Sequence, residues 1–138
     1  MSLQQISVFL ENRAGELVSV TSALAEKNID LRALHISETE DYGVLRLIAS
    51  EWERAVSVLQ ENGIVVSLSP VIVVSVPDRP GGLNSLLSAL SEENVNVSYM
   101  YSVFGRHDGS ANMVFKVEDI ENVEKMLTEK GFKIALLD

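Results

Sequence analysis

The apolar positions of this chain follow two periods in turn, the two-residue period of strands and the 3.6-residue period of helices. Ile6, Val8 and Leu10 stand at alternate positions, which predicts a strand, and residues 17–25 then place apolar side chains on one helical face. The same reading continues to residue 68. It predicts strands over 29–34, 44–49 and 64–68, and a helix over 51–62 that ends at Gly63.

The second half of the chain repeats this order. Strands are predicted over 71–76, 95–104, 111–118 and 132–137, and helices over 81–93 and 119–130. Strand-helix-strand-strand-helix-strand is the ferredoxin-like pattern, whose right-handed crossovers place both helices on one face of a four-stranded sheet. The second strand is an edge that can pair with an equivalent edge. We therefore expect an α+β fold: two units side by side in an eight-stranded antiparallel sheet, with four helices on one face.

The two halves are copies of one unit. An offset of 66 residues aligns Arg13 with Arg79, and the offset becomes 68 from the third strand onward, so two residues are inserted in the second copy. We expect two domains, residues 1–69 and 70–138, joined at Ser69-Pro70. Units this small bury only about 60% of their unfolded surface. The halves are therefore expected to pack on each other.

Each copy places a glycine-containing turn between its first strand and first helix. The first turn is Asn12-Arg13-Ala14-Gly15-Glu16-Leu17, and the second is Asp78-Arg79-Pro80-Gly81-Gly82-Leu83. Such a turn directs the free N–H groups of the helix N-terminus, and the positive end of its dipole, at anions such as carboxylates. Glycine allows positive φ and close approach of a ligand to the backbone. The turns are therefore candidate anion-binding loops.

Composition narrows the function classes. The net charge is −9, with 11 Lys and Arg against 20 Asp and Glu, which makes nucleic acid an unfavourable partner. The chain has no cysteine, and neither His35 nor His107 has a second ligand at metal spacing, so we expect no metal site and no cofactor. It also has no apolar run of membrane-spanning length. We expect a cytoplasmic protein that does not bind membranes.

The two turns, together with Asn28-Ile29-Asp30-Leu31 and Asn94-Val95-Asn96-Val97, resemble the signature of ACT domains, which sense small molecules in amino-acid metabolism. The resemblance covers nearly the whole chain as a tandem pair, and the first turn is similar to the regulatory domain of phosphoglycerate dehydrogenase. In such domains a free amino acid lies between the first loop of one domain and the second strand of its neighbour. The resemblance therefore implies ligand sites at the interface of the two units.

The residues implied by this resemblance fall into three groups. Asn12 and Asp78 would be side-chain contacts, and Asp30 and Asn96 would reach the ligand from the second strands. The backbone of the two loops would hold the carboxylate, through Arg13, Ala14, Gly15, Glu16 and Leu17 and through Arg79, Pro80, Gly81, Gly82 and Leu83. Ala14 replaces the usual proline, and Asp30 stands where asparagine is common, so the resemblance leaves open whether both loops bind.

The leading interpretation is a non-enzymatic regulatory protein that binds a free amino acid, with a homodimer or an enzyme of amino-acid metabolism as its protein partner. Two alternatives stay open. The chain can be an interaction subunit that docks on an enzyme without a ligand, because Asp, Asn and Gly in such turns also serve as helix caps. It can also be an acylphosphatase-like enzyme with Arg79 at the phosphate, although the sequence offers no positioned nucleophile or base.

Overall fold

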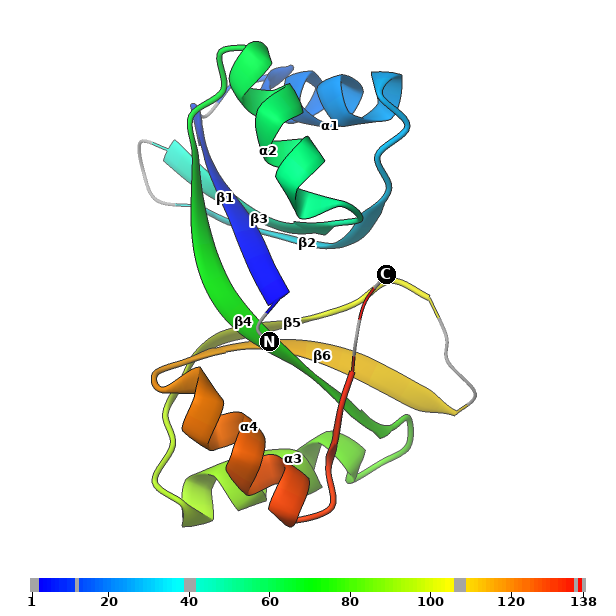
Figure 1. Cartoon of the computed structure of the whole chain (residues 1–138), viewed down its shortest axis with the longest axis vertical. Coiled ribbons are helices and arrows are strands. Elements are labelled where there is room, and N and C mark those ends of the chain that lie inside the picture. Colours follow the sequence, from blue (N-terminus) through cyan, green and yellow to red (C-terminus); the bar gives the residue numbers. More distant parts are fainter. Residues whose placement is uncertain (1–2, 12, 39–41, 106–108, 136, 138) are drawn as a thin grey trace. The chain divides into compact units, whose positions relative to one another are not determined.

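The computed structural model describes residues 3–11, 13–38, 42–105, 109–135 and 137. These residues form four helices and seven strands (Figure 1). In chain order the elements are β1 (Leu3–Glu11), α1 (Glu16–Glu26), β2 (Leu31–Glu38), β3 (Tyr42–Ala49), α2 (Trp52–Glu61), β4 (Val66–Pro77), α3 (Gly82–Glu92), β5 (Val97–Ser102), β6 (Ser110–Val117), α4 (Ile120–Glu129) and β7 (Lys133–Ile134).

The strands follow the hydrogen-bonded order β2-β3-β1-β4-β6-β5, and β7 also pairs with β4. The chain divides into two compact units. The first contains Gln4–Ser69, and the second contains Leu3 and the described residues from Pro70 to Leu137. Strand β4 therefore contributes its first residues to one unit and its last residues to the other.

In the first unit, α1 and α2 cover one face of the strands (Figure 1). Strand β1 runs antiparallel to β3, with Ile6 opposite Leu47 and Val8 opposite Leu45. These four side chains are at most 1% exposed and pack with Leu24 of α1 and with α2. The alternation of buried and exposed positions on β1 thus places the core on the helix-covered face.

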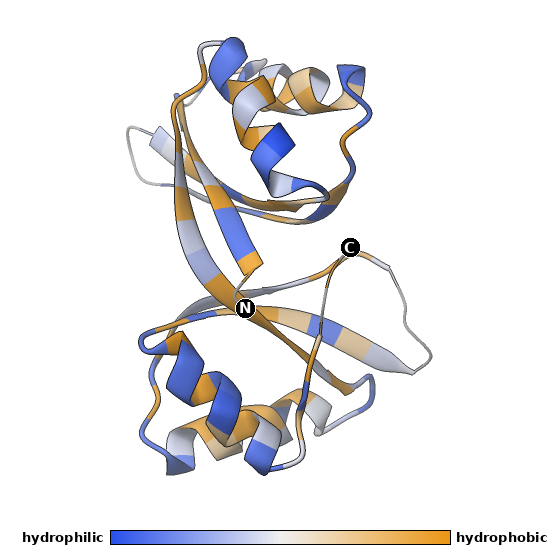
Figure 2. Cartoon of the chain, in the orientation of Figure 1, coloured by the Kyte–Doolittle hydropathy of each residue, from blue (hydrophilic) through white to orange (hydrophobic). Residues whose placement is uncertain are grey.

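The second unit repeats this arrangement, with α3 and α4 on one face of β4 to β6 (Figure 1). Ile72 lies opposite Phe115 and Val74 opposite Met113 across the antiparallel pair β4 and β6. Both partners of the first pair are fully buried, and they pack against Leu90 of α3. The helices mix hydrophobic and hydrophilic positions along their length (Figure 2), as expected for helices that cover a sheet with one side.

The predicted helices are present, but the predicted strands differ in number and in order. The second strand of each unit was expected to pair with its equivalent, whereas β2 and β5 are the first and last strands of the order, and β1 and β4 are neighbours in it. The structure describes seven strands instead of eight, because the strands predicted over 64–68 and 71–76 form one strand, β4. The predicted joint, Ser69-Pro70, lies within it. Proline fixes φ near −65°, which an extended strand accepts at an exposed position, and Pro70 is exposed. A proline between two apolar runs therefore did not end the strand here.

Candidate functional site

The two predicted loops have nearly the same backbone conformation. Gly15 precedes α1 with φ 92° and ψ −15°, and Gly81 precedes α3 with φ 87° and ψ −11°. In the first loop the N–H of Arg13 donates to the carbonyl of Glu11 at 2.9 Å, and the N–H of Arg79 makes the equivalent bond to Pro77 at 2.9 Å. Such positive φ is open to glycine at little cost. The repeat therefore conserves the loop geometry as well as the sequence.

Neither helix that follows a loop is capped by a side chain. No side-chain hydrogen bond caps α1 or α3, although Ser19 and Ser85 donate their backbone N–H groups to Gly15 and Gly81 at 3.0 Å within the first turn. Among the residues described, Ala14 and Pro80 are exposed in the loops, whereas Asn12 lies outside the described residues. The N–H of Gly82 donates to the carbonyl of Arg79 at 3.0 Å, and the other N–H groups at the start of each helix remain for an external acceptor.

The two arginines differ in their partners. Arg13 donates from Nε to Glu16 at 2.8 Å and lies 3.2 Å from the carboxylate of Glu11. Within the described ranges, Arg79 pairs with no carboxylate, and the N–H of Asp78 donates to the carbonyl of Gly109 at 2.8 Å. The first loop therefore neutralises its own arginine, and the second loop presents its arginine to solvent.

Residue 82 brings the second loop close to the preceding strand. A Cβ on Gly82 would lie 2.0 Å from the carbonyl oxygen of Pro77, so only glycine fits there. The equivalent position in the first loop is Glu16, whose side chain is 22% exposed. Leu83 packs against the core of its unit, whereas Leu17 is 37% exposed. Leu83 thus has a packing role, and Gly82 a steric one.

Each loop borders a pocket within its own unit. The first pocket, of about 400 Å³, includes Phe9, Glu11, Glu16, Ser19, Tyr42, Gly63, Ile64 and Val65. The second, of about 500 Å³, includes Ser75, Pro77, Arg79, Gly81, Gly82, Ser85, Ser110, Gly131, Phe132 and Lys133. The two linings correspond under the offsets of the repeat, so both pockets lie between the loop and the turn that follows the second helix of the unit.

The equivalent pockets differ in chemistry. The first has two carboxylates, Glu11 and Glu16, and the exposed rings of Phe9 and Tyr42, whose centroids lie 5.9 Å apart. At the matching positions the second has Pro77, Gly82, Ser75 and Ser110, and it adds the cations Arg79 and Lys133. An anion is therefore favoured only in the second pocket.

The residues predicted on the second strands lie apart from these pockets. The backbone N–H of Asp30 donates to Ser50 Oγ at 3.1 Å, and the carboxylate of Asp30 lies 3.6 Å from Arg32. Asn96 lines a different pocket of the second unit, together with Asn94 and Asn122. Within each unit, the described loop pocket therefore includes neither Asp30 nor Asn96.

Sequence reasoning missed the residues that complete the second pocket. Lys133, Phe132 and Gly131 come from the turn after α4, about 50 residues beyond the loop. The repeat carried a usable signal, because Gly131 aligns with Gly63 and both have positive φ, of 92° and 75°. A glycine kept at the same turn in both copies marks a fixed backbone path.

The structure also bears on metal binding, on the two histidines and on membrane-spanning helices. Among the described residues no group of three His, Asp or Glu side chains is placed to hold a metal ion. His35 lies on β2 opposite Arg46, and His107 lies outside the described residues. No helix in the described part of the chain is both long and apolar enough to span a membrane.

A solved structure from Bacteroides thetaiotaomicron is similar to this chain in both sequence and fold. The crystal structure of protein BT0572 from Bacteroides thetaiotaomicron is 38% identical, with a TM-score of 0.91 over 98% of this chain and 92% of that chain. No curated protein sequence matches significantly.

More distant structures share the fold. The ligand-free regulatory subunit of aspartate kinase from Thermus thermophilus is 15% identical, with a TM-score of 0.67 over 93% of this chain and 91% of that chain. Aspartokinase III of E. coli, solved with lysine and aspartate, is 19% identical, with a TM-score of 0.53 over 94% of this chain and 31% of that chain. Residues 1–135 match the sequence profile of ACT domain pairs. The chain thus belongs to the ACT domain pair family.

Proposed function

We propose that this chain is a regulatory protein that binds a free amino acid, and that the second loop holds the carboxylate of the ligand. The observation that carries the proposal is the uncapped N-terminus of α3 beside a pocket of about 500 Å³ that contains Arg79 and Lys133. Helix-end N–H groups and a guanidinium both bind carboxylates, and their fields add at one point.

The first loop does not hold the ligand carboxylate in this proposal. Arg13 is already paired with Glu11 and Glu16, so a ligand carboxylate would have to displace a carboxylate of the protein and would meet the charge of the other. The chain therefore has one strong amino-acid site, although its loop sequence is duplicated.

The structural relatives support a regulatory function. One is a regulatory subunit of aspartate kinase, and another is an aspartokinase solved with two amino acids. In the arrangement implied by the family, an acceptor at the start of a second strand, Asp30 or Asn96, binds the ammonium group. Regulation then requires that the ligand prefer one arrangement of the chain over another, since equal affinity for two arrangements shifts nothing.

Calorimetric titration with the twenty amino acids tests this function. We expect heat from one amino acid or a few related ones. Arg79→Gln is expected to weaken that binding about tenfold or more, because a charge-assisted pair to a carboxylate contributes roughly 1.5–3 kcal/mol. Arg13→Gln is the matched control, since it makes the same change in the self-paired loop, and it should leave the affinity within about twofold. Absence of heat with all twenty would overturn the proposal.

An observation in the first unit supports a second candidate function, docking on a protein partner such as an enzyme of amino-acid metabolism or a second copy of the chain. Three apolar side chains around the first pocket are exposed: Phe9 at 60%, Tyr42 at 43% and Val65 at 77%. Clustered exposed apolar side chains are typical of interaction surfaces. Sedimentation of the wild type and of Phe9→Ser measures self-association through this surface. An unchanged monomer in both would leave only a different protein as partner.

A further inference from the structure

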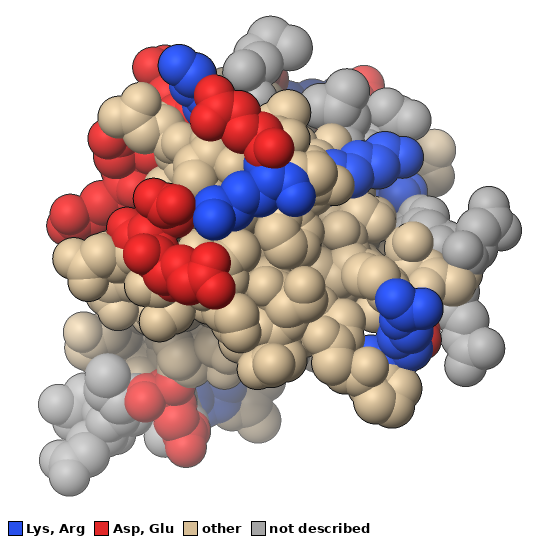
Figure 3. All heavy atoms as spheres, turned by 90° about the horizontal axis from the view of Figure 1, so that it is seen from below, with Lys and Arg blue, Asp and Glu red and all other residues tan. Residues whose placement is uncertain are grey.

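The second unit has another pocket, formed where α3 ends, β5 begins and α4 begins. It measures about 480 Å³, and its polar lining includes Glu93, Asn94, Asn96, Glu118, Asp119 and Asn122. The lining has three carboxylates and no Lys or Arg. Acidic side chains gather along one side of the face that carries α3 and α4 (Figure 3). Acidity alone does not define a ligand, but the first unit provides a direct comparison.

In the first unit an arginine occupies the equivalent place. Arg54 of α2 donates from Nη2 to the carbonyl of Lys27, at 2.5 Å, and from Nη1 to the carboxylate of Glu51, at 3.3 Å. Lys27 is the C-cap residue of α1, so the guanidinium binds the negative end of that helix. The first unit therefore shows what this end of the fold accepts, namely a guanidinium held between a helix-end carbonyl and a carboxylate.

The second unit keeps the acceptors and lacks the cation. Under the repeat offsets Arg54 corresponds to Asn122, Glu51 to Asp119 and Lys27 to Glu93. The backbone is conserved as well, because Glu51 and Asp119 both have left-handed φ, of 50° and 54°. Arg32, the other arginine at this end of the first unit, corresponds to Ser98. Both guanidinium groups are thus absent from the second copy, and the space that they would fill is a pocket.

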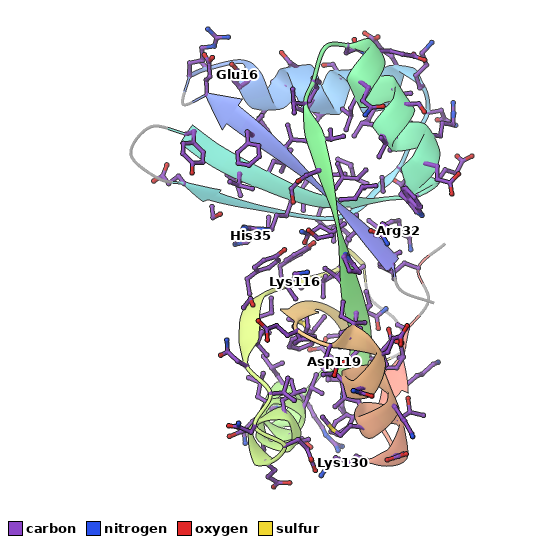
Figure 4. All side chains as sticks on the ribbon, turned by 60° about the vertical axis from the view of Figure 1, so that its left-hand side comes forward. Glu16, Arg32, His35, Lys116, Asp119 and Lys130 are labelled. Carbon is purple, nitrogen blue, oxygen red and sulfur yellow. The ribbon has the colours of Figure 1, made fainter. Side chains whose placement is uncertain are left out.

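The cations present nearby do not fill this place. Lys130 lies at the far end of α4 from Asp119 (Figure 4) and pairs with Glu92 and Glu93 at 3.7 and 3.4 Å. Asn122 donates to the carboxylate of Asp119 at 2.5 Å, which leaves further lone pairs of that carboxylate available. No Lys or Arg of the described residues pairs with Asp119 or Glu118. Of the three carboxylates in the lining, Glu93 is therefore paired with Lys130, whereas Glu118 and Asp119 have no cation partner among the described residues.

We propose that this pocket binds a small molecule through a guanidinium group, which takes the position that Arg54 occupies in the first unit. Its planar N–H groups would donate to the carbonyl of Glu93 and to the carboxylate of Asp119. Glu118 adds long-range attraction. The site shares no residue with the second loop pocket. Asn96, which also lines it, is one of the two acceptors that the family arrangement assigns to the ammonium group of the amino acid, and the guanidinium contacts do not involve Asn96.

Titration with methylguanidinium, followed by amide chemical shifts at constant ionic strength, tests this proposal. Methylurea is the control ligand, because it has nearly the same shape and no charge. We expect saturable shifts at Asn94, Asp119 and Asn122 with methylguanidinium and none with methylurea. Equal responses to both ligands, or shifts that scatter over all acidic residues, would overturn the proposal. Shifts of the same amides with Ca²⁺, and none with methylguanidinium, would also overturn the proposal.

Variants localise the binding. Asn122→Arg restores the arrangement of the first unit, and we expect it to abolish the shifts and to raise the thermal midpoint. Asp119→Asn should weaken binding at least tenfold, whereas Glu121→Gln removes the same charge from α4 outside the pocket and should change binding by less than twofold. Arg79→Gln should bind methylguanidinium like the wild type. If Asp119→Asn and Glu121→Gln lowered the affinity for methylguanidinium equally, net charge alone would explain the binding, and the proposal would be contradicted.

Discussion

One of the aligned positions at which the two loops differ is Glu16 in the first copy and Gly82 in the second. Glu16 supplies the carboxylate that holds Arg13, whereas Gly82 has no side chain and lets the loop approach the carbonyl of Pro77. Gly82→Ala is expected to destabilise the fold by at least about 1–3 kcal/mol, because the new Cβ collides with a backbone atom that cannot rotate away. Denaturant unfolding measures this effect.

Gly43→Ala is the matched control at the residue scale. A Cβ on Gly43 meets its nearest neighbour, the carbonyl oxygen of Ser37, at 3.6 Å, which is an ordinary contact. We expect a change within about 0.5 kcal/mol, as for other surface substitutions without strain. Similar losses in both variants would mean that glycine content, and not the close approach at residue 82, sets the stability.

At this scale the sequence predicted where the loops lie, but not how their side chains pair. The duplicated glycines Gly15 and Gly81 were visible as a repeat, and both have positive φ, whereas Gly82 begins α3 without it. The pairing of Arg13 with Glu16 depends on two side chains three residues apart across a turn, and an exposed arginine has many rotamers. The repeat alone therefore left open which loop holds an available arginine.

At the scale of elements, α2 and α4 share an unusual start. The residue before each helix, Glu51 or Asp119, has left-handed φ, and no side chain caps either helix. A left-handed conformation costs a residue with a Cβ about 1–2 kcal/mol. Glu51→Gly should therefore stabilise the protein by up to about 1 kcal/mol, because the relief of strain exceeds the entropy lost with glycine and the exposed pair of Glu51 with Arg54 contributes little.

Asn28→Gly provides the comparison, since Asn28 also has positive φ, of 57°, at the end of α1. Asparagine tolerates this conformation better than glutamate, so we expect almost no gain. Thermal unfolding of both variants measures the difference. A larger gain at Asn28 than at Glu51 would contradict this account of the helix starts.

Strand β4 is the element whose extent could not be predicted from this sequence. The apolar runs 64–68 and 71–76 were recognised, and all four helices were placed within a few residues of their observed bounds. Whether two adjacent apolar runs form one strand or two depends on partners that are distant in the sequence. Strands β6 and β7 pair with residues 72–77 of β4, and β1 is the other neighbour of β4 in the strand order. Local pattern does not contain that information, because tertiary pairing decides it.

At the scale of the whole molecule, duplication gave two copies with different surfaces. Each unit has its own buried core, and the core positions follow the repeat: Leu24 aligns with Leu90, and Leu59 with Leu127, all at most 2% exposed. The pocket linings diverged instead, with Lys133 replacing Val65 and Asn122 replacing Arg54. Core positions are predictable because packing constrains them, whereas pocket chemistry depends on residues that only the fold brings together.

This divergence predicts the stoichiometry of amino-acid binding. A symmetric pair of sites would bind two ligands per chain, but only the second loop combines an uncapped helix N-terminus with cations that no carboxylate of the described residues neutralises. We expect one molecule of the bound amino acid per chain by calorimetry. The double variant Glu11→Gln and Glu16→Gln should raise this number toward two, because it releases Arg13 while leaving Gly15 and the backbone of the first loop in place. Two equal sites in the wild type would show that the ion pairs of Arg13 do not prevent the first loop from binding an amino acid.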